Sequence, residues 1–573
     1  MSSGLITLVN PNKVFPPIAP YGLDVLTTAL EQAGFDVDVL DLTFRRDEWK
    51  SFLAEYFAER TPLLVGVSVR NTDTVYALEQ RPFVGEHKEI ITEVMRLSDA
   101  PLVCGGIGFS TMPFALVEYF GVDFGVKGPG EQILVDLADA VATGRDPATV
   151  PGLIRNTPEG VTRVPPPALR LPHGLSAPVS PTADGEDRVW QVDRSGAYRR
   201  RSGQPYKVDN LQHYHKGGLG SILTKNGCTY RCAHCVEPNA KGNRFGRRDI
   251  AAVVDEMQSL TEQGVLDLHT TDSEFNLSIA HAKSVLREIV RRKRADSGNP
   301  LNDLRLWVYC QPSPFDEEFA GLLAEAGCRG VNVGSDHIRA DLLRDWKVTG
   351  GGSTYYTFAD TERLVRLCHE NGLQTMVEAL FGMPGETMET MRECVEAFMA
   401  LDATVTGFSL GLRLFPYIPL GVDLAQQCDG VRTAPGLQSN TATAPIVLKP
   451  LAACSGPAEY ERQFMFDEHG DFRLVCYLSP DLAEDVTNPS VRWERTVERL
   501  WDLVDPAEHH RVMLPTIGGT SEIDNNYADN PFLTSLSRLG YTGAFWSHWR
   551  DREAIMREAG AAGILETPEA GRR

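Results

Sequence analysis

Three cysteines in one short loop constrain this chain more than any other feature. A short apolar strand is followed by Gly227, and then Cys228, Cys232 and Cys235 are spaced C-x3-C-x2-C. Three thiolates on such a loop can hold three irons of an iron–sulfur cube and leave the fourth iron open for chemistry. A zinc site would normally use a fourth local Cys or His, and we expect His234, inside the triplet, to point elsewhere. We therefore predict a [4Fe–4S] cluster on these three cysteines.

The composition narrows the class of partner. The chain has 573 residues, enough for two or three domains, and a net charge of -21, which disfavours nucleic acid and anionic membranes as partners. The other eight of its eleven cysteines are scattered singly, as in a reducing cytoplasm. The N-terminus has no charged segment typical of a signal peptide, and no apolar run is long enough to span a membrane. We predict a cytoplasmic protein that acts on a small molecule.

The first 155 residues have the pattern of a doubly wound parallel sheet. Strand and helix patterns alternate, and apolar strands are predicted at residues 5–9, 37–42, 63–69 and 102–104. Glycine pairs at the strand ends let a large ligand approach the backbone beyond the carboxyl ends of the strands. No G-x-G-x-x-G follows the first strand, which argues against a dinucleotide. The sequence predicts a Rossmann-like domain over residues 1–155.

The rest of the chain divides into three parts. Residues 156–210 are rich in proline and read as a linker. Residues 211–420 contain six strand–helix units, which predict a partial (β/α)6 TIM barrel with its active site at the carboxyl ends of the strands. Residues 421–573 predict a small α+β domain, whose aromatic residues either form a core or cover the open side of the barrel. The fold class is therefore α/β with three domains.

Together these motifs resemble the cobalamin-dependent radical S-adenosylmethionine (SAM) methyltransferases over roughly the first 420 residues. The resemblance implies that glycine-containing turns of the first domain surround cobalamin. The residues that it assigns to this role are Tyr21, Gly22, Gly105, Gly106, Gly108, Gly128, Gly130 and Glu131.

One departure from the family concerns the lower face of cobalt. Many cobalamin domains carry a D-x-H-x-x-G loop whose His ligates cobalt, but the first histidine of this chain is His87. Arg70, after the third strand, is placed where such a ligand would sit, although a surface ion pair explains it equally well. A guanidinium is always protonated and has no lone pair for cobalt.

The resemblance also assigns residues at the ends of the barrel strands. It implies that Ser335, Asp336 and Gly382 contact SAM, with Gln311 beside them. Glu274, after the second strand, would ligate the fourth iron, and it counts as catalytic together with Arg70 and Tyr309. Either Tyr309, after the third strand, or a carboxylate of a bound ligand would act as the base. Asp272 and Asn276 can instead cap the helix that follows them.

Within this family the chain is most similar to members that methylate C2 of L-tryptophan in thiopeptide antibiotic biosynthesis. The resemblance implies a polar double displacement through methylcobalamin, with a [4Fe–4S] cluster, cobalamin and SAM as cofactors and an electron donor for cobalamin reactivation. A carboxylate on the fourth iron would keep SAM from chelating it and so disfavour radical cleavage. Two alternatives stay open: radical methylation of an sp3 carbon of another natural product, and a non-catalytic cobalamin or iron–sulfur sensor.

Overall fold

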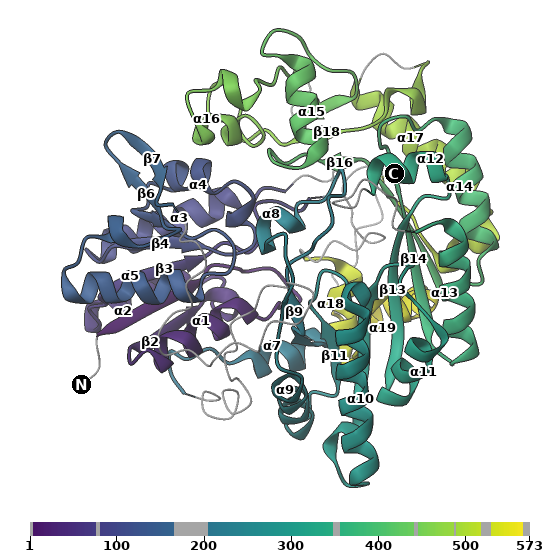
Figure 1. Ribbon diagram of the computed structural model, residues 1–573, viewed down its shortest axis with the longest axis horizontal. Coiled ribbons are helices and arrows are strands. Elements are labelled where there is room, and N and C mark those ends of the chain that lie inside the picture. Colours follow the sequence, from purple (N-terminus) through teal and green to yellow (C-terminus); the bar gives the residue numbers. More distant parts are fainter. Residues whose placement is uncertain are drawn as a thin grey trace.

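The computed structural model describes residues 4–75, 81–165, 204–347, 356–439, 445–485, 489–516 and 529–564. Two α/β bodies lie side by side, the N-terminal one in purple and blue and the barrel in teal and green (Figure 1). Segments from the last third of the chain pack against both bodies, so parts of the chain that are distant in sequence lie together.

The N-terminal body is a seven-stranded sheet in the order β2-β1-β3-β4-β5-β6-β7. Strands β1 to β5 are parallel: Leu5–Asn10, Asp36–Asp41, Leu64–Ser68, Leu102–Gly105 and Phe124–Gly125. Helices α1 (Tyr21–Gln32) and α5 (Glu131–Thr143) share one core, while α2 (Trp49–Glu59), α3 (Val84–Leu97) and α4 (Pro113–Phe120) share another. The predicted doubly wound domain is confirmed.

Two antiparallel strands extend this sheet beyond the predicted boundary at residue 155. Strand β6 is Ile154–Thr157 and β7 is Gly160–Arg163. The polar residues and glycine of this hairpin read as linker in the sequence, because an edge hairpin buries little apolar surface. The linker prediction therefore began too early, and most of its remaining residues lie outside the described ranges.

The barrel sheet has the order β19-β15-β14-β13-β12-β11-β8. Its six predicted strands are present as β8 (Gly220–Ile222), β11 (Asp267–Thr270), β12 (Arg305–Cys310), β13 (Cys328–Asp336), β14 (Gln374–Phe381) and β15 (Val405–Leu410). They are joined by helices α9 (Ile250–Glu262), α10 (Ile279–Ala295), α11 (Glu317–Ala326), α13 (Phe358–Glu370) and α14 (Met388–Ala400). The predicted partial barrel is confirmed, and β19 (Val512–Met513) adds a seventh parallel strand from the C-terminal region.

Alternation along the strands separates the outside of the barrel from its interior. On β12, Leu306, Val308 and Cys310 belong to the core shared with the helices, whereas Trp307 belongs to a different cluster inside the barrel. Because successive strand residues point to opposite faces, Tyr309 shares the inner face with Trp307.

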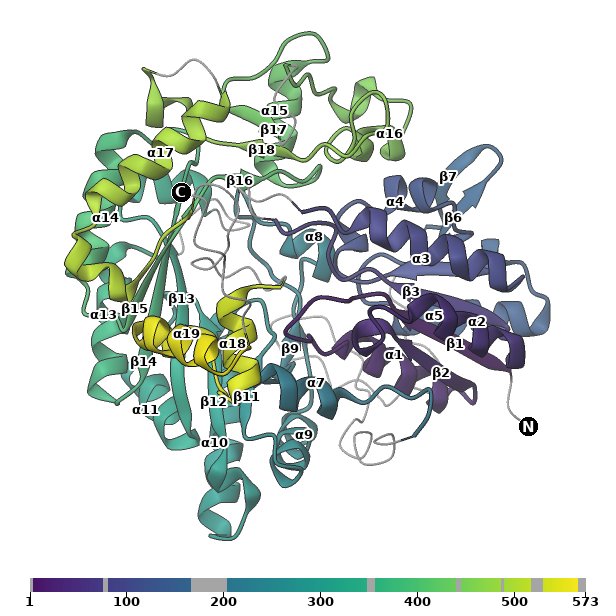
Figure 2. The same ribbon diagram turned by 180° about the vertical axis from the view of Figure 1, so that it is seen from behind.

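The C-terminal region splits into two parts with different positions. The first contains α15 (Pro419–Cys428), α16 (Pro457–Arg462) and the small sheet β16-β18-β17 (Leu412–Arg413, Val475–Tyr477 and Leu437–Ser439), and it shares one hydrophobic core with the N-terminal body. The second contains α18 (Pro531–Leu539) and α19 (Arg552–Ala561), in yellow across the barrel strands in Figure 2. No helix in the described ranges is long and apolar enough to cross a membrane.

Tryptophans of the second part close the amino end of the barrel. Trp546 packs edge-on against Trp307 at a ring-centroid distance of 5.5 Å, and Trp549 Nε1 donates to Val512 O at 3.1 Å. These aromatics therefore form a core, one of the two alternatives that the sequence left open. Sequence alone could not assign these aromatics to a barrel end.

Glu461 joins the C-terminal region to the N-terminal body. This fully buried carboxylate accepts hydrogen bonds from Phe114 N (2.7 Å) and Ala115 N (2.9 Å) in the first turn of α4, and from Tyr417 Oη (2.9 Å). The N-terminal end of a helix favours negative charge. Burial nevertheless dominates and raises the pKa of Glu461 to about 7, with these hydrogen bonds acting in the opposite direction. The interface is therefore sensitive to pH.

We predict that Glu461 makes this interface less stable as the pH rises. A raised pKa in the folded state means that the stabilisation is complete below the unfolded pKa of about 4.5 and is lost as pH rises toward 7. Between pH 5 and 7.5 the melting temperature of the parent should therefore fall relative to that of Glu461→Gln. The control is Glu118→Gln, which changes an exposed partner of Arg462 at the same interface. Parallel curves for parent and Glu461→Gln would contradict the prediction.

Candidate functional site

A cavity of about 250 Å³ lies at the carboxyl ends of the N-terminal strands. Barrel residues also line it, from Leu223 and Asn226 near the cysteine loop to Lys241. Seven of the eight residues predicted to surround cobalamin are in its wall: Tyr21, Gly22, Gly105, Gly106, Gly128, Gly130 and Glu131. Glu131 Oε2 is buried without a hydrogen-bond partner, which suits a ligand that carries amide donors. These residues therefore fit a large amide-bearing ligand such as cobalamin.

Gly108 and Arg70 lie apart from the lining of this cavity. A Cβ at Gly108 would stand 2.7 Å from Arg70 O, so glycine is required here for a close backbone contact rather than for a ligand. Gly106 has φ +107° and would clash in the same way with Val69 O, at 2.5 Å. Arg70 itself lines a small neighbouring cavity together with Lys13 and His87. The two glycines thus hold the loop that presents Arg70.

The cysteine loop is shaped by its own backbone. Gly227 has φ +83°, and a Cβ there would lie 1.9 Å from Arg244 O, so no other residue fits. Cys228 N donates to Gly242 O at 3.0 Å, and Cys235 N donates to Cys232 O at 3.2 Å. All three cysteines are free thiols, two of them buried. The loop therefore presents the three sulfurs predicted to hold a cluster.

Glu274 lies close enough to these thiols to influence their pKa values. Burial raises the pKa of Cys228 and Cys232 to about 12, and Glu274 adds to the shift of both. Burial also raises the pKa of Glu274 to about 8, against the lowering effect of Lys347 and Lys225, and its Oε2 has no hydrogen-bond partner. Buried acidic groups this close together lose their protons when they bind a metal, because the metal takes the place of the protons.

No three His, Cys, Asp or Glu side chains converge on a single-ion position in the described part of the chain. In a [4Fe–4S] cluster, by contrast, each ligand binds a different iron, so the ligands do not converge on one point. The three thiols and the unsatisfied Glu274 carboxylate are chemically suited to such a cluster.

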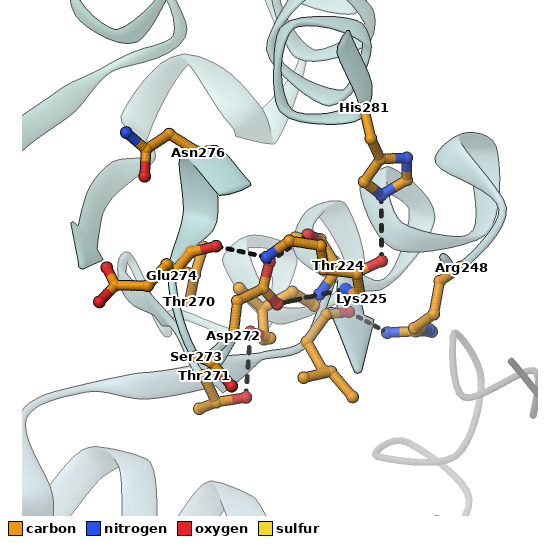
Figure 3. A network of polar contacts seen from close by, with 12 residues as sticks. Thr224, Lys225, Arg248, Thr270, Thr271, Asp272, Ser273, Glu274, Asn276 and His281 are labelled. Carbon is orange, nitrogen blue, oxygen red and sulfur yellow. Dashed lines mark hydrogen bonds and ion pairs between the residues drawn. The ribbon is translucent and has the colours of Figure 1, made fainter. Parts of the chain in front are cut away.

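A buried ion pair fixes the loop that carries Glu274 (Figure 3). Asp272 accepts hydrogen bonds from Thr224 N (2.7 Å), Lys225 N (3.2 Å) and Lys225 Nζ (3.1 Å). Lys225 Nζ also donates to the backbone oxygen of Glu274. Figure 3 shows the Glu274 carboxylate projecting away from this network. Asp272 therefore does not cap a helix but ties the strand before the cysteines to the second strand end.

The remaining predicted SAM residues lie at other strand ends. Asp336 has φ +56° and pairs with the buried Lys347 at 2.8 Å. Ser335 differs, because its hydroxyl bonds to Thr361 Oγ1 at 2.7 Å within the barrel wall. Alternation along β13 directs the Ser335 side chain toward α13 on the outer face of the sheet, and its contact with SAM stays a prediction. Gly382, at the end of β14, has φ +101°.

The side-chain amide of Asn276 holds the backbone that follows β12, the third predicted barrel strand. Asn276 Nδ2 donates to Gln311 O at 2.8 Å, and Gln311 N donates back to Asn276 Oδ1 at 3.0 Å. Gln311 Oε1 is left buried without a partner, so it can accept a hydrogen bond from a ligand. Asn276 is therefore a link between strands and not a helix cap.

Tyr309 lies on the inner face of β12. A Cβ added to Gly334 would stand 2.7 Å from the Tyr309 hydroxyl. Burial, then Glu378 and Glu274, raises the pKa of Tyr309 well above its usual value. A phenol held protonated in this way is better suited to donate a hydrogen bond than to act as the base suggested by the sequence.

Sequence reasoning missed three charged groups of this site. Lys225 sits within the strand before the cysteines, Lys347 follows α12 (Ala340–Trp346), and Glu378 is in the middle of β14. Each lies in an otherwise unremarkable segment. A charged residue inside a predicted buried strand, as at Lys225 and Glu378, is the one signal that could have identified two of them.

Comparisons with known proteins agree with this geometry. Residues 222–398 match the Radical SAM superfamily model, and residues 9–138 match the B12 binding domain model. The chain is 64% identical to a tryptophan 2-C-methyltransferase of Streptomyces laurentii over 98% of both chains.

Solved structures give the same result. A radical SAM methyltransferase, TsrM, from Kitasatospora setae with cobalamin and a [4Fe-4S] cluster bound is 71% identical and superposes with a TM-score of 0.90 over 99% of this chain and 100% of that one. A structure of TsrM with tryptophan and the SAM analogue aza-SAM bound has a TM-score of 0.89 at 71% identity, over 97% of this chain and 99% of that one. The cobalamin-dependent S-adenosylmethionine radical enzyme OxsB shares the fold. It is 14% identical, with a TM-score of 0.54 over 70% of this chain and 53% of that one.

We predict that the Asp272–Lys225 pair is essential for assembly of the cysteine loop. Asp272→Asn leaves the Lys225 ammonium buried without its counter-charge, a change that costs about 3–5 kcal/mol. Reconstituted protein should lose thermal stability and bind less iron per chain. Asp341→Asn, at an exposed pair with Arg339, is the control. Full iron content and parental stability in Asp272→Asn would show that the pair does not hold the loop.

Proposed function

Because this chain belongs to the family of the Streptomyces laurentii tryptophan 2-C-methyltransferase, we propose that it transfers a methyl group from SAM to C2 of L-tryptophan. The observation that carries the proposal is the pairing of the glycine-lined cavity with the cysteine loop across one interface. We place the reaction in the cytoplasm and in the biosynthesis of a thiopeptide antibiotic, with an electron donor that restores reduced cobalamin. The reaction replaces the C2–H bond of the indole by C2–CH3 and releases one proton.

The cofactors are assigned to residues already described. Cys228, Cys232 and Cys235 would hold the [4Fe–4S] cluster, and the cavity between Tyr21 and Glu131 would hold cobalamin. When bound, cobalamin supplies a nucleophilic metal that relays the methyl group of SAM to the substrate. Two in-line displacements would give net retention at the methyl carbon.

Glu274 and Arg70 tune this chemistry in the proposal. The Glu274 carboxylate, buried beside the thiols with one oxygen unsatisfied, would occupy the fourth iron and keep SAM from chelating it. Arg70 would lie below cobalamin without bonding to the metal, because a guanidinium has no lone pair to donate. Both residues thus favour polar transfer over radical cleavage.

Tyr309 would position the indole in the proposal. Its hydroxyl lies over Gly334 inside the barrel, and its raised pKa keeps it protonated. We therefore propose that Tyr309 donates a hydrogen bond to the substrate or to SAM. A carboxylate of a bound ligand then removes the proton that the indole releases.

The function is tested by anaerobic turnover of the reconstituted protein with SAM and L-tryptophan. Mass spectrometry should detect 2-methyltryptophan and S-adenosylhomocysteine in equal amounts, with no stoichiometric 5'-deoxyadenosine. SAM that carries a chiral methyl group should give product with retained configuration. Stoichiometric 5'-deoxyadenosine or a racemised methyl group would support a radical route instead.

We predict that Glu274→Ala shifts the balance toward SAM cleavage. Removing the carboxylate opens the fourth iron to SAM, so the ratio of 5'-deoxyadenosine to methylated product should rise at least about tenfold, roughly the effect of one charged interaction. Glu237→Ala, at a neighbouring carboxylate that hydrogen-bonds Ser273, is the matched control. If Glu274→Ala cleaves SAM no faster than the parent, Glu274 is not an iron ligand.

A further inference from the structure

The interior of the barrel contains a layer of polar side chains below the strand ends. Along each strand these side chains alternate with residues that face outward into the core shared with the helices. The layer consists of the partly buried residues His269, Tyr309, Asn332, Glu378 and Ser409. Below them the barrel is filled by an apolar layer that includes Trp307, Met376 and Trp546. Because these inward side chains keep part of their surface accessible, the barrel leaves space between this polar layer, called the floor below, and the strand ends.

Glu378 stands on this floor between two glycines of the neighbouring strands. In the sheet it is paired with Gly334 on β13 and with Gly407 on β15. A Cβ at Gly407 would lie 3.2 Å from Glu378 Cγ, and a Cβ at Gly334 would lie 2.7 Å from the Tyr309 hydroxyl. Asn332 on β13 hydrogen-bonds the carboxylate, and the Tyr309 hydroxyl lies over Gly334. Glu378 still keeps part of its surface accessible inside the barrel, which leaves room for a ligand atom.

The carboxylate of Glu378 has no cationic partner in the described part of the chain. Burial raises its pKa to about 7, and the only lowering contribution comes from a hydrogen bond with Asn332. Burial also lowers the pKa of His269, on the same floor, so this ring stays neutral. A buried carboxylate without a counter-charge is costly unless a ligand supplies one.

Acceptor positions at Glu378 and Asn332 are available to a ligand. Asn332 Oδ1 is buried without a hydrogen-bond partner, and the Glu378 oxygens offer further acceptor positions. A primary ammonium has three donors, a positive charge and no acceptor, so it complements this site. A carboxylate or phosphate would be repelled here, and an indole N–H brings one donor and no charge.

We propose that Glu378, with Asn332 Oδ1, binds the α-ammonium group of the amino-acid substrate. This inference rests on the proposed function, because that function supplies an amino acid as the methyl acceptor. The ammonium at the floor would anchor the substrate in the barrel, with its side chain available to the cofactors above. Glu378 is then a specificity residue that separates amino acids from indoles without an amine.

Calorimetric titration of the reconstituted holoenzyme tests the proposal. The parent should bind L-tryptophan more tightly than indole-3-propionate, which has the same ring and carboxylate but no amine. Glu378→Gln should weaken tryptophan binding by roughly 10- to 100-fold, the range for a hydrogen bond to a charged group, and leave indole-3-propionate binding unchanged. In turnover, KM for tryptophan should rise by a similar factor while kcat changes only a few-fold.

Controls separate a binding defect from misfolding. Glu468→Gln changes an exposed glutamate and should match the parent. Iron and cobalamin contents of Glu378→Gln are measured, and if they fall, the comparison of the two ligands in the parent decides alone. A parent that binds both ligands equally, or a loaded Glu378→Gln that keeps its preference for tryptophan, overturns the proposal. A parent that methylates no tryptophan would instead overturn the proposed function, and this inference with it.

Discussion

The buried ion pair between Lys225 and Asp272 is the contact on which the site depends most. Asp272 binds both the backbone and the side chain of the segment that leads into the cysteine loop, while Lys225 reaches the backbone of Glu274. Both charged side chains are almost completely buried, so neither can be released to water cheaply. The ligands from the first strand and the carboxylate from the second are thereby held at a fixed separation before any cofactor binds, as a preorganised site requires.

Buried carboxylates recur across the molecule, and their surroundings assign them different roles. Glu461 is satisfied by two backbone donors and a tyrosine, and it joins two parts of the fold. Glu131 and Glu274 each keep one buried oxygen without a partner, one facing the cavity of the N-terminal body and the other beside the cysteines. Burial raises the pKa of each, but of these three only Glu131 and Glu274 have an oxygen open to a ligand. Satisfaction of hydrogen bonds, more than the pKa shift, therefore separates structural from functional carboxylates here.

The sequence predicted the architecture well because its strongest patterns are local. The cysteine spacing, the glycine turns and the alternation of strands with helices each fall within a short segment, and the structure has both predicted sheets. The hairpin β6–β7 and strand β19 were missed because each is short, and their pairing depends on distant strands. The placement of Trp546 below the barrel likewise depends on Trp307, more than two hundred residues earlier.

Side-chain direction was the harder problem at the site. Ser335 and Asp336 are adjacent, yet one bonds to the barrel wall and the other pairs with Lys347, so a prediction by position gave both the same role. Lys347 and Glu378 could not be placed at all, because nothing local says which charged residue of a strand or helix end faces the barrel interior. The structure places two carboxylates at different heights along the barrel. Glu274 stands at the strand ends beside the thiols, whereas Glu378 lies further down inside the barrel, opposite Gly334. Because the apolar layer with Trp307 and Trp546 fills the barrel below Glu378, a substrate whose ammonium bound to Glu378 would extend toward the strand ends that carry Glu274.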